Sequence, residues 1–140
     1  MVKVLIADSI SEVVCKIFEE NKIEFEKKTG LSEDELALEI KDYDGLLVRS
    51  AVTVTKKIID AAVNLKVIGR PGVGVDNVDF SSCKDLDIPI INTPDMFGSE
   101  VADIAMGYII ALARETFQID RNIRDGHWPK LRGISLSGKS

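Results

Sequence analysis

The sequence has few of the residues on which several kinds of site depend. Its 140 residues include 2 cysteines and 1 histidine. Cys15 and Cys83 occur in segments with helical periodicity rather than in a paired framework, so we expect two reduced, buried thiols. His127 lies in the segment DGHWP, with no serine, cysteine or second carboxylate placed for a proton relay. We therefore expect His127 to be non-catalytic.

Common catalytic and metal-binding motifs are also missing. The chain contains no Cys/His cluster and no H-E-x-x-H, G-x-S-x-G or G-x-x-x-x-G-K-[ST] motif. No residue is therefore assigned to a metal. Neither acyl transfer nor chemistry on nucleoside triphosphates is expected.

Clustered positive charge and long apolar runs at the N-terminus are absent as well. The 18 basic and 23 acidic residues give a net charge of -5 and form no basic stripe, so nucleic acid is not an expected partner. The first apolar run, residues 2–7, ends at Asp8 and is too short for a signal peptide or a spanning helix. We expect a cytoplasmic protein with no membrane partner.

The residues that are present predict one α/β domain. A hydrophobic content of 45% can form a single core. Ser11 is a candidate N-cap, and Ser32 with Glu35 forms a candidate capping box. Strands are predicted over 2–7, 23–27, 45–49, 66–69 and 88–91, and helices over 11–20, 32–41, 55–63, 78–86 and 99–124. Residues 126–140, with three glycines and a proline, are predicted to form a loop.

This alternation of strands and helices predicts a parallel sheet. Five short apolar strands with right-handed crossovers suit a flavodoxin-like strand order of 2-1-3-4-5, with helices on both faces. Ligands of such sheets bind beyond the carboxyl ends of the strands. A functional site is therefore expected at the turns after residues 7, 49, 70 and 92.

The segment IGRPGVGVDNVD, residues 68–79, is the most informative candidate site. Exposed N–H groups of Val73, Gly74 and Val75 could form a concave nest for a carboxylate or phosphate, with Arg70 as a cation beside it. The segment does not match the dinucleotide motif G-x-G-x-x-G, because Asn77 stands where the third glycine is needed. The alternative is a tight turn whose glycines only permit a positive φ.

Arg49 and Ser50 end the third predicted strand, at the same edge of the sheet as Arg70. Two arginines at one edge suggest an anionic ligand, because a guanidinium can bind a carboxylate or phosphate through two hydrogen bonds. The alternative for Arg49 is a solvated charge or an ion pair with Asp8 or Asp44.

The predicted helix over 99–124 is apolar nearly all round from Val101 to Leu112. One sheet face could cover only one side of it, so we expect a homodimer formed through this helix. The alternative is an ordinary core helix in which Asp103, near the N-terminus, interacts favourably with the helix dipole.

Five segments in order resemble the N-terminal part of the NAD-dependent D-2-hydroxyacid dehydrogenases. They are VRSAVTVT, VIGRPGVGVDNVD, INTPD, VADIAMGYIIALAR and RDGHW…SLSGK. The resemblance implies a substrate domain in residues 1–98, a crossover helix over 99–125 and a loop over 126–140 that leads into a Rossmann domain. That domain would begin just after Leu136–Lys139, so the family's catalytic residues would lie beyond Ser140 and none is assigned here.

The resemblance also implies roles for residues of the substrate side. The backbone at Val73 and Gly74 would receive the carboxylate of a 2-hydroxyacid, and Arg49 and Arg70 would face a distal anionic group. Val73 and Ala105 would contact the nicotinamide cofactor, NAD. Ser50 and Asn77 complete the expected substrate-binding set.

Two departures and one ambiguity accompany the resemblance. Pro71 stands where the family usually has Ala, which removes one N–H from the turn, and Asp103 stands where many members have Glu. The paired arginines favour the members that act on 3-phosphoglycerate. The segment PDMFGSEVADIA also resembles glyoxylate and hydroxypyruvate reductases.

Two rival functions differ in class from a dehydrogenase. A receiver domain shares the fold and also has an acid after its first strand, here Asp8. It needs an aspartate at the end of the third strand and a lysine at the end of the fifth, where this sequence has Arg49-Ser50 and Asn92-Thr93. The other rival is a non-enzymatic module that only self-associates.

Overall fold

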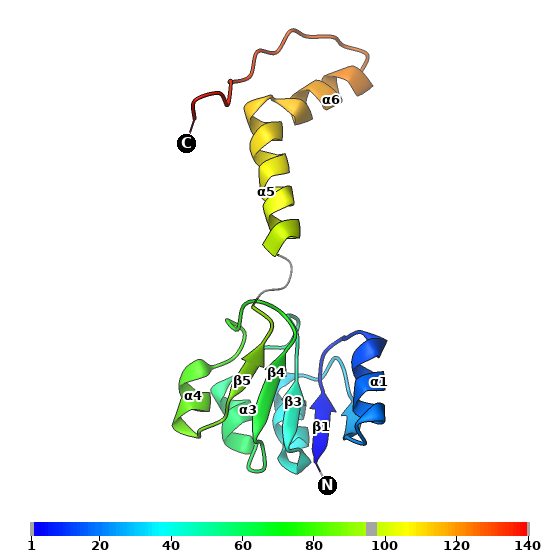
Figure 1. The fold of residues 1–140 in the computed structure, drawn as a ribbon, viewed down its shortest axis with the longest axis vertical. Coiled ribbons are helices and arrows are strands. Elements are labelled where there is room, and N and C mark those ends of the chain that lie inside the picture. The colour runs from blue at the N-terminus through cyan, green and yellow to red at the C-terminus, as the bar shows by residue number, and fades with distance from the viewer. Residues whose placement is uncertain (1, 95–97, 140) are drawn as a thin grey trace. The chain divides into compact units, whose positions relative to one another are not determined.

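The computed structural model describes residues 2–94 and 98–139, in two compact units, Met1–Met96 and Phe97–Ser140 (Figure 1). The first unit holds a five-stranded sheet and its helices, and the second holds two helices and an extended tail. The strands are β1 (Lys3–Ile6), β2 (Glu24–Lys27), β3 (Gly45–Leu47), β4 (Val67–Arg70) and β5 (Ile90–Asn92). The helices are α1 (Glu12–Glu20), α2 (Glu33–Glu39), the 3-10 turn η1 (Ile40–Asp42), α3 (Lys56–Ala61), α4 (Phe80–Asp85), α5 (Gly98–Ala113) and α6 (Thr116–Arg124).

The sheet is parallel throughout and has the order β2-β1-β3-β4-β5. This confirms the predicted flavodoxin-like fold. Leu5 of β1 pairs with Leu46 of β3, and Leu46 pairs with Ile68 of β4. Because every strand runs the same way, all five carboxyl ends lie along one edge of the sheet.

The caps predicted from the sequence form at α1 and α2. The Ser11 side chain accepts a hydrogen bond from the Val13 N–H at the start of α1. At α2 the Ser32 side chain accepts from the Glu35 N–H, while the Glu35 side chain accepts from the Ser32 N–H. Each cap satisfies backbone donors that the first helical turn leaves open.

The core lies on both faces of the sheet because successive strand residues point in opposite directions. Leu5, Leu46 and Ile68 belong to the larger buried cluster, which α2, α3 and α4 cover. Ile6 belongs to a smaller cluster with Cys15 of α1 on the opposite face. Cys15 and Cys83 are both buried and free, as expected.

The second unit corrects one prediction. A single helix over 99–124 is wrong, because Glu115 adopts a left-handed conformation with φ 55° and separates α5 from α6. The break leaves the Ala113 carbonyl free to accept the Ile134 N–H at 2.7 Å. The rings of Tyr108 and Phe117, 6.3 Å apart, pack α5 against α6.

Two further features bear on the predictions for the tail and for a membrane. Residues 126–139 form neither helix nor strand, and the His127 N–H donates to the Asn122 carbonyl at 2.8 Å. Across residues 2–94 and 98–139, no helix combines the length and apolar character needed to cross a membrane.

Candidate functional site

The carboxyl edge of the sheet gathers the polar residues that the sequence singled out. Asp8 follows β1, Arg49 and Ser50 follow β3, Arg70 is the last residue of β4, and Asn92 is the last residue of β5. Strands β3 and β4 are neighbours, so Arg49 and Arg70 lie at adjacent strand ends. The Arg49 side chain is exposed, whereas Arg70 is half-buried.

The turn over residues 72–75 presents free backbone donors. Within the described part of the chain, the N–H groups of Val73, Gly74 and Val75 have no hydrogen-bond acceptor. Three carbonyls of the same turn are occupied, since Gly72 accepts from the Thr93 N–H at 3.0 Å, Val73 from the Asn92 side chain at 2.7 Å and Val75 from the Val78 N–H at 3.0 Å. A turn with occupied acceptors and open donors suits an anion rather than a cation.

Arg70 lies directly against this turn. A Cβ placed on Gly72 would overlap the Arg70 guanidinium, so the absence of a side chain at Gly72 makes room for that group. The Arg70 Nε is buried and has no hydrogen-bond partner among the described residues. A buried charged donor without a partner is costly, and an anionic ligand would satisfy it.

The two glycines of the turn do not adopt a positive φ, which was the alternative explanation for them. In the described residues, positive φ occurs at glycines 30, 126, 133 and 138, and neither Gly72 nor Gly74 is among them. Both glycines instead permit close approach, of the Arg70 guanidinium to Gly72 and of the Asp76 carboxylate to Gly74. The Asp76 Oδ1 lies 2.7 Å from the place where a Gly74 Cβ would stand. Asp76 therefore puts one negative charge beside the turn.

Asp8 is a buried carboxylate whose role the sequence did not predict. It is 6% exposed, and its Oδ2 accepts the N–H groups of Arg49 at 3.0 Å, Ala51 at 2.9 Å and Val52 at 3.3 Å. Asp8 thus contacts the backbone of Arg49 rather than its guanidinium, in contrast to the ion pair considered as an alternative. The available signal was an acid placed directly after a buried strand.

Asn77 likewise contacts backbone. Its Nδ2 donates to the carbonyl of Arg49 at 2.6 Å and to that of Val52 at 2.7 Å. The Asn77 amide thus binds the loop after β3. The sequence had predicted a substrate contact for Asn77 and not this contact. Ser50, the other residue of that expectation, is exposed in the same loop.

The two expected cofactor contacts lie in different units. The Val73 side chain is 50% exposed on the turn of the first unit. Ala105 is exposed on α5 of the second unit. The segment PDMFGSEVADIA, which bears on the choice of substrate, includes residues 95–97, and these lie outside the described residues.

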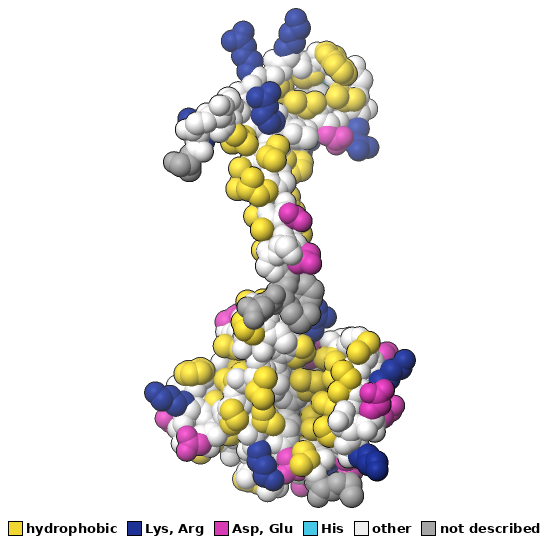
Figure 2. All heavy atoms as spheres, in the orientation of Figure 1, with side chains coloured by type: hydrophobic (Ala, Val, Ile, Leu, Met, Phe, Trp, Pro, Cys, Tyr) yellow, Lys and Arg dark blue, Asp and Glu magenta, His cyan; other side chains and the backbone are white. Residues whose placement is uncertain are grey.

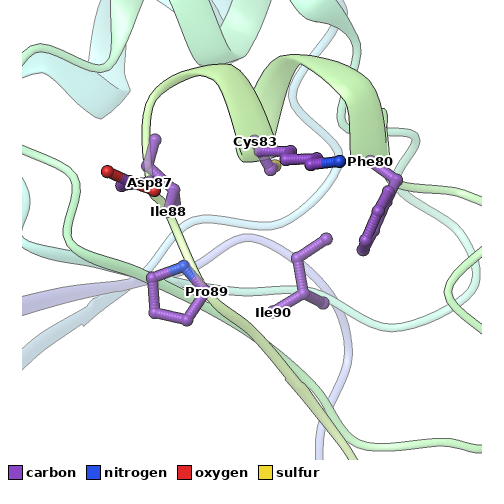
Figure 3. Close-up of a pocket in the computed structure, with 7 residues that line it drawn as sticks. Phe80, Cys83, Asp87, Ile88, Pro89 and Ile90 are labelled. Carbon is purple, nitrogen blue, oxygen red and sulfur yellow. The ribbon is translucent and has the colours of Figure 1, made fainter.

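A cavity of about 420 Å³ lies elsewhere in the first unit, between α4 and the start of β5 (Figure 3). Its lining includes Phe80, Cys83, Ile88 and Pro89. Ile88 and Pro89 precede β5, whereas the candidate site follows the strand ends. The cavity is therefore distinct from the anion turn, and the charged residues of its lining are Lys84 and Asp87.

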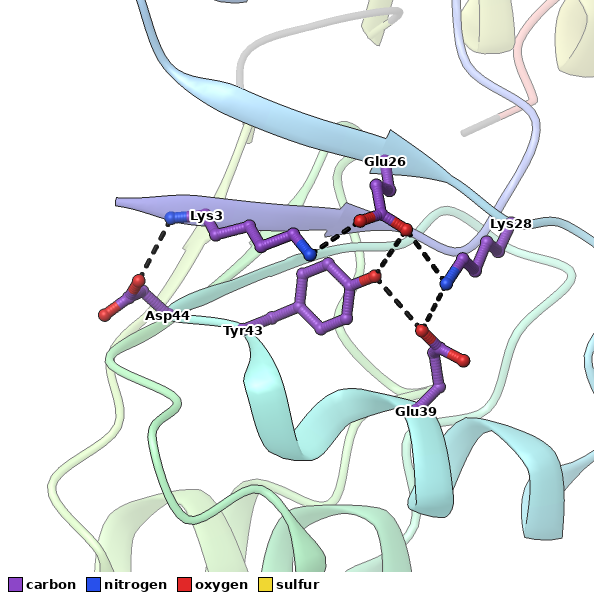
Figure 4. Close-up of polar contacts among 6 residues, drawn as sticks. All are labelled: Lys3, Glu26, Lys28, Glu39, Tyr43 and Asp44. Carbon is purple, nitrogen blue, oxygen red and sulfur yellow. Dashed lines mark hydrogen bonds and ion pairs between the residues drawn. The ribbon is translucent and has the colours of Figure 1, made fainter. Parts of the chain in front are cut away.

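A second polar cluster surrounds Tyr43, whose side chain is buried (Figure 4). The Tyr43 hydroxyl donates to Glu26 at 2.9 Å and lies 3.1 Å from a Glu39 oxygen, and Lys28 forms ion pairs with both carboxylates. Lys3 lies 4.6 Å from the centre of the Tyr43 ring. The groups satisfy one another, so the cluster stabilises the fold and does not form a ligand site.

The cluster shifts several protonation equilibria. Hydrogen bonds from Lys3, Lys28 and Tyr43 lower the pKa of Glu26 to about 2. The hydrogen bond from Lys28 is the main cause that lowers the pKa of Glu39, and burial raises the pKa of Tyr43.

Near the described residues of the anion turn, no group of three or more His, Cys, Asp or Glu side chains could hold a metal ion.

Comparison with known proteins adds evidence independent of this geometry. The family model described as "D-isomer specific 2-hydroxyacid dehydrogenase, catalytic domain" matches residues 4–136. A D-3-phosphoglycerate dehydrogenase of Methanocaldococcus jannaschii is 44% identical over 142 residues, which cover 100% of this chain and 27% of that relative. The chain thus spans about a quarter of the length of the curated relatives it matches.

Two solved structures are similar over nearly the whole chain. One is an NAD+-bound 3-phosphoglycerate dehydrogenase of Entamoeba histolytica, 27% identical with a TM-score of 0.74, covering 96% of this chain and 43% of that one. The other is an NADPH-dependent glyoxylate/hydroxypyruvate reductase of Sinorhizobium meliloti in complex with citrate. It is 28% identical with a TM-score of 0.78, covering 99% of this chain and 44% of that one.

Proposed function

Because the chain belongs to the D-isomer specific 2-hydroxyacid dehydrogenase family, we propose that its first unit binds the anionic substrate of such an enzyme. The N–H groups of Val73 and Gly74 receive the carboxylate of the 2-hydroxyacid, and Arg70 supplies the positive charge beside it. The observation that carries the proposal is the turn itself, whose donors at residues 73–75 are open while three of its four carbonyls are occupied.

The substrate favoured by the charges is 3-phosphoglycerate. Its carboxylate and its phosphate need two separated cationic or donor groups, and Arg49 and Arg70 stand at adjacent strand ends. The D-3-phosphoglycerate dehydrogenase of Methanocaldococcus jannaschii supports this choice. The alternative substrates are glyoxylate and hydroxypyruvate, which the similarity to the Sinorhizobium meliloti reductase supports.

NAD is the cofactor proposed for the complete enzyme, where it accepts the hydride from the substrate. The half-exposed Val73 side chain fits a contact with the nicotinamide, because it stands beside the open donors of the turn. The sequence contains no G-x-G-x-x-G for the pyrophosphate. We therefore propose that these 140 residues bind and orient substrate but do not transfer a hydride on their own.

Self-association through α5 is part of the proposal. Its exposed apolar side chains are Val101, Ile104, Met106, Tyr108, Ile109, Ile110 and Leu112. Figure 2 shows hydrophobic side chains along α5. A second copy of the chain would bury this exposed apolar surface. The proposed partners are thus a second copy of the chain, with which it forms a homodimer, and the small anionic substrate.

Binding of anions by the purified chain tests the proposal. Titration of the 15N-labelled chain with 3-phosphoglycerate is expected to shift the amide resonances of Val73 and Gly74. Arg70→Gln is expected to weaken binding about tenfold, because a charge-assisted hydrogen bond contributes roughly 1.5–3 kcal/mol. Arg132→Gln removes the same charge from the second unit and serves as the matched control. A wild-type chain whose turn amides do not respond to the ligand would refute the proposed function.

A further inference from the structure

The loop over residues 49–52, which follows β3, is held through its backbone from two sides. On one side the Asp8 Oδ2 accepts the N–H groups of Arg49, Ala51 and Val52. The other Asp8 oxygen, Oδ1, accepts the Ser9 N–H at 2.6 Å. Asp8 is 6% exposed, so its charge is balanced by four backbone donors rather than by water.

On the other side, the Asn77 Nδ2 donates to the carbonyls of Arg49 and Val52. The backbone of Asn77 is tied to the same region, because its carbonyl accepts the Val54 N–H at 2.8 Å. Asn77 follows the anion turn by two residues, so it connects that turn to the loop over residues 49–52. The first and last residues of the loop thus each bind both Asp8 and Asn77.

This arrangement requires the residue types that are present. A carboxylate oxygen can accept several N–H groups at once, whereas an amide at position 8 would place its NH2 group against one of those donors. An amide NH2 group can donate to two carbonyls, whereas a carboxylate at position 77 would repel both. The Asn77 Oδ1 takes no part in these contacts, since it is buried and has no hydrogen-bond partner among the described residues.

We propose that Asp8 and Asn77 are positioning residues that hold Arg49 in a fixed place relative to the turn over residues 72–75. The proposal rests on the proposed function, because it assumes that both elements bind one anionic substrate. In this role Asp8 and Asn77 act through the backbone of Arg49. Holding the loop in one conformation avoids an entropic cost of ordering it when the substrate binds.

Two ligands separate this role from a general loss of stability. 3-Phosphoglycerate has a carboxylate for the turn and a phosphate for Arg49, whereas acetate offers a carboxylate alone. In Asp8→Asn and Asn77→Ser, we expect the affinity for 3-phosphoglycerate to fall about tenfold, because hydrogen bonds to the loop are lost. The affinity for acetate, read from the Val73 and Gly74 amide shifts, is expected to change less than about twofold.

Asp44→Asn is the matched control. Asp44 also accepts a backbone N–H, that of Lys3 at 3.0 Å, but it precedes β3 and lies at the opposite edge of the sheet. This variant is expected to lose stability without a change in the ratio of the two affinities. If Asp8→Asn does not fold, Asn77→Ser alone tests the positioning role, because this substitution removes only donors to an exposed loop.

The outcomes distinguish the two proposals. A wild-type chain that binds neither ligand at the turn refutes the proposed function. A wild-type chain that binds both, with variants that keep the wild-type ratio of affinities, refutes the positioning role alone. Equal weakening of both ligands in Asn77→Ser would show a structural role only.

Discussion

Arg70 and Gly72 form a pair in which one residue provides a charge and the other leaves the space for it. The guanidinium occupies the place where a side chain of residue 72 would stand. In Gly72→Ala the new methyl group displaces the guanidinium, so the affinity for an anion is expected to fall about tenfold through loss of a charge-assisted hydrogen bond. Calorimetry with 3-phosphoglycerate measures this change.

The fold is expected to tolerate Gly72→Ala. Gly72 is not among the residues with positive φ, so the free energy of unfolding is expected to stay within about 1 kcal/mol of wild type. Gly107→Ala is a suitable control, because a Cβ at that position of α5 meets no atom within 4 Å. Unchanged affinity in Gly72→Ala would show that Arg70 does not act at the turn.

Glu26 makes stability depend on acid pH. Its pKa is lowered from 4.5 to about 2 in the folded chain, so the unfolded chain binds more protons between these values. The stabilisation is present above pH 4.5 and is lost as the pH falls toward 2. We expect Glu26→Gln to be less stable than wild type at pH 7, with a difference that shrinks as the pH falls through this range.

Urea denaturation of both proteins from pH 2 to 7 measures that difference. Glu24→Gln on the same strand is the control, because within the described residues Glu24 forms no ion pair. A difference between wild type and Glu26→Gln that is independent of pH would contradict the assignment of the shift to this carboxylate.

Residue roles at the site were only partly predictable from the sequence. The IGRPGVGVDNVD segment could be placed at a strand end from the sequence, and the N–H groups of residues 73–75 are open in the structure. Binding of an anion by these groups stays a prediction. The contacts of Asp8 and Asn77 could not be predicted, because their partners lie far away along the chain. Arg49 is 41 positions from Asp8 and 28 positions from Asn77. Only the assembled sheet brings those backbone groups within reach.

At the scale of elements, the helix break at Glu115 is a feature that hydrophobic periodicity did not predict. The sequence around residue 115 contains no glycine or proline, so a continuous helix over 99–124 was the expected result. Glu115 nevertheless adopts φ 55°, and the contact of Ile134 with the Ala113 carbonyl accompanies the break. Such a cap comes from a distant part of the chain and leaves no local signal.

The apolar surface of α5 leads to a prediction on assembly. The Ile109 side chain is 49% exposed, and Ile109→Glu would place a charge within the proposed dimer contact. We expect the wild-type chain to be a dimer and this variant to be a monomer by light scattering. Val63→Glu, at an apolar residue that is 79% exposed in the first unit, is the matched control. A wild-type chain that stays monomeric at high concentration would refute the proposed dimer.

At the scale of the whole molecule, the 140 residues are expected to bind an anion without catalysing oxidation. They contain no dinucleotide glycine motif, and their one histidine, His127, lies in the second unit rather than on the anion turn. Calorimetry is expected to show no tight binding of NAD, and absorbance at 340 nm no formation of NADH from 3-phosphoglycerate. Micromolar affinity for NAD or steady turnover would contradict this expectation.

The fold as a whole was the most predictable property of the chain. Strand lengths, helix spacing and the caps at Ser11 and Ser32 all point to the same alternation, and the right-handed crossover restricts the order of strands. The five strands pair in the order expected from the sequence. Hydrophobic periodicity and crossover handedness depend on one or two elements, so they suffice to predict the fold. They do not predict contacts such as those of Asp8.

The strand order has a consequence for how the chain acquires its structure during synthesis. Strand β1 receives β2 on one side and β3 on the other, and β4 and β5 then add to the growing edge in the order in which they are made. Each new strand therefore finds its neighbour already present, which limits exposure of unpaired edges to other chains. The two outermost strands, β2 and β5, are expected to exchange their amide hydrogens first, and the central strand β3 last. The anion turn, which Asn92 of β5 helps to hold, would then be the last part of the sheet edge to form and the first to open.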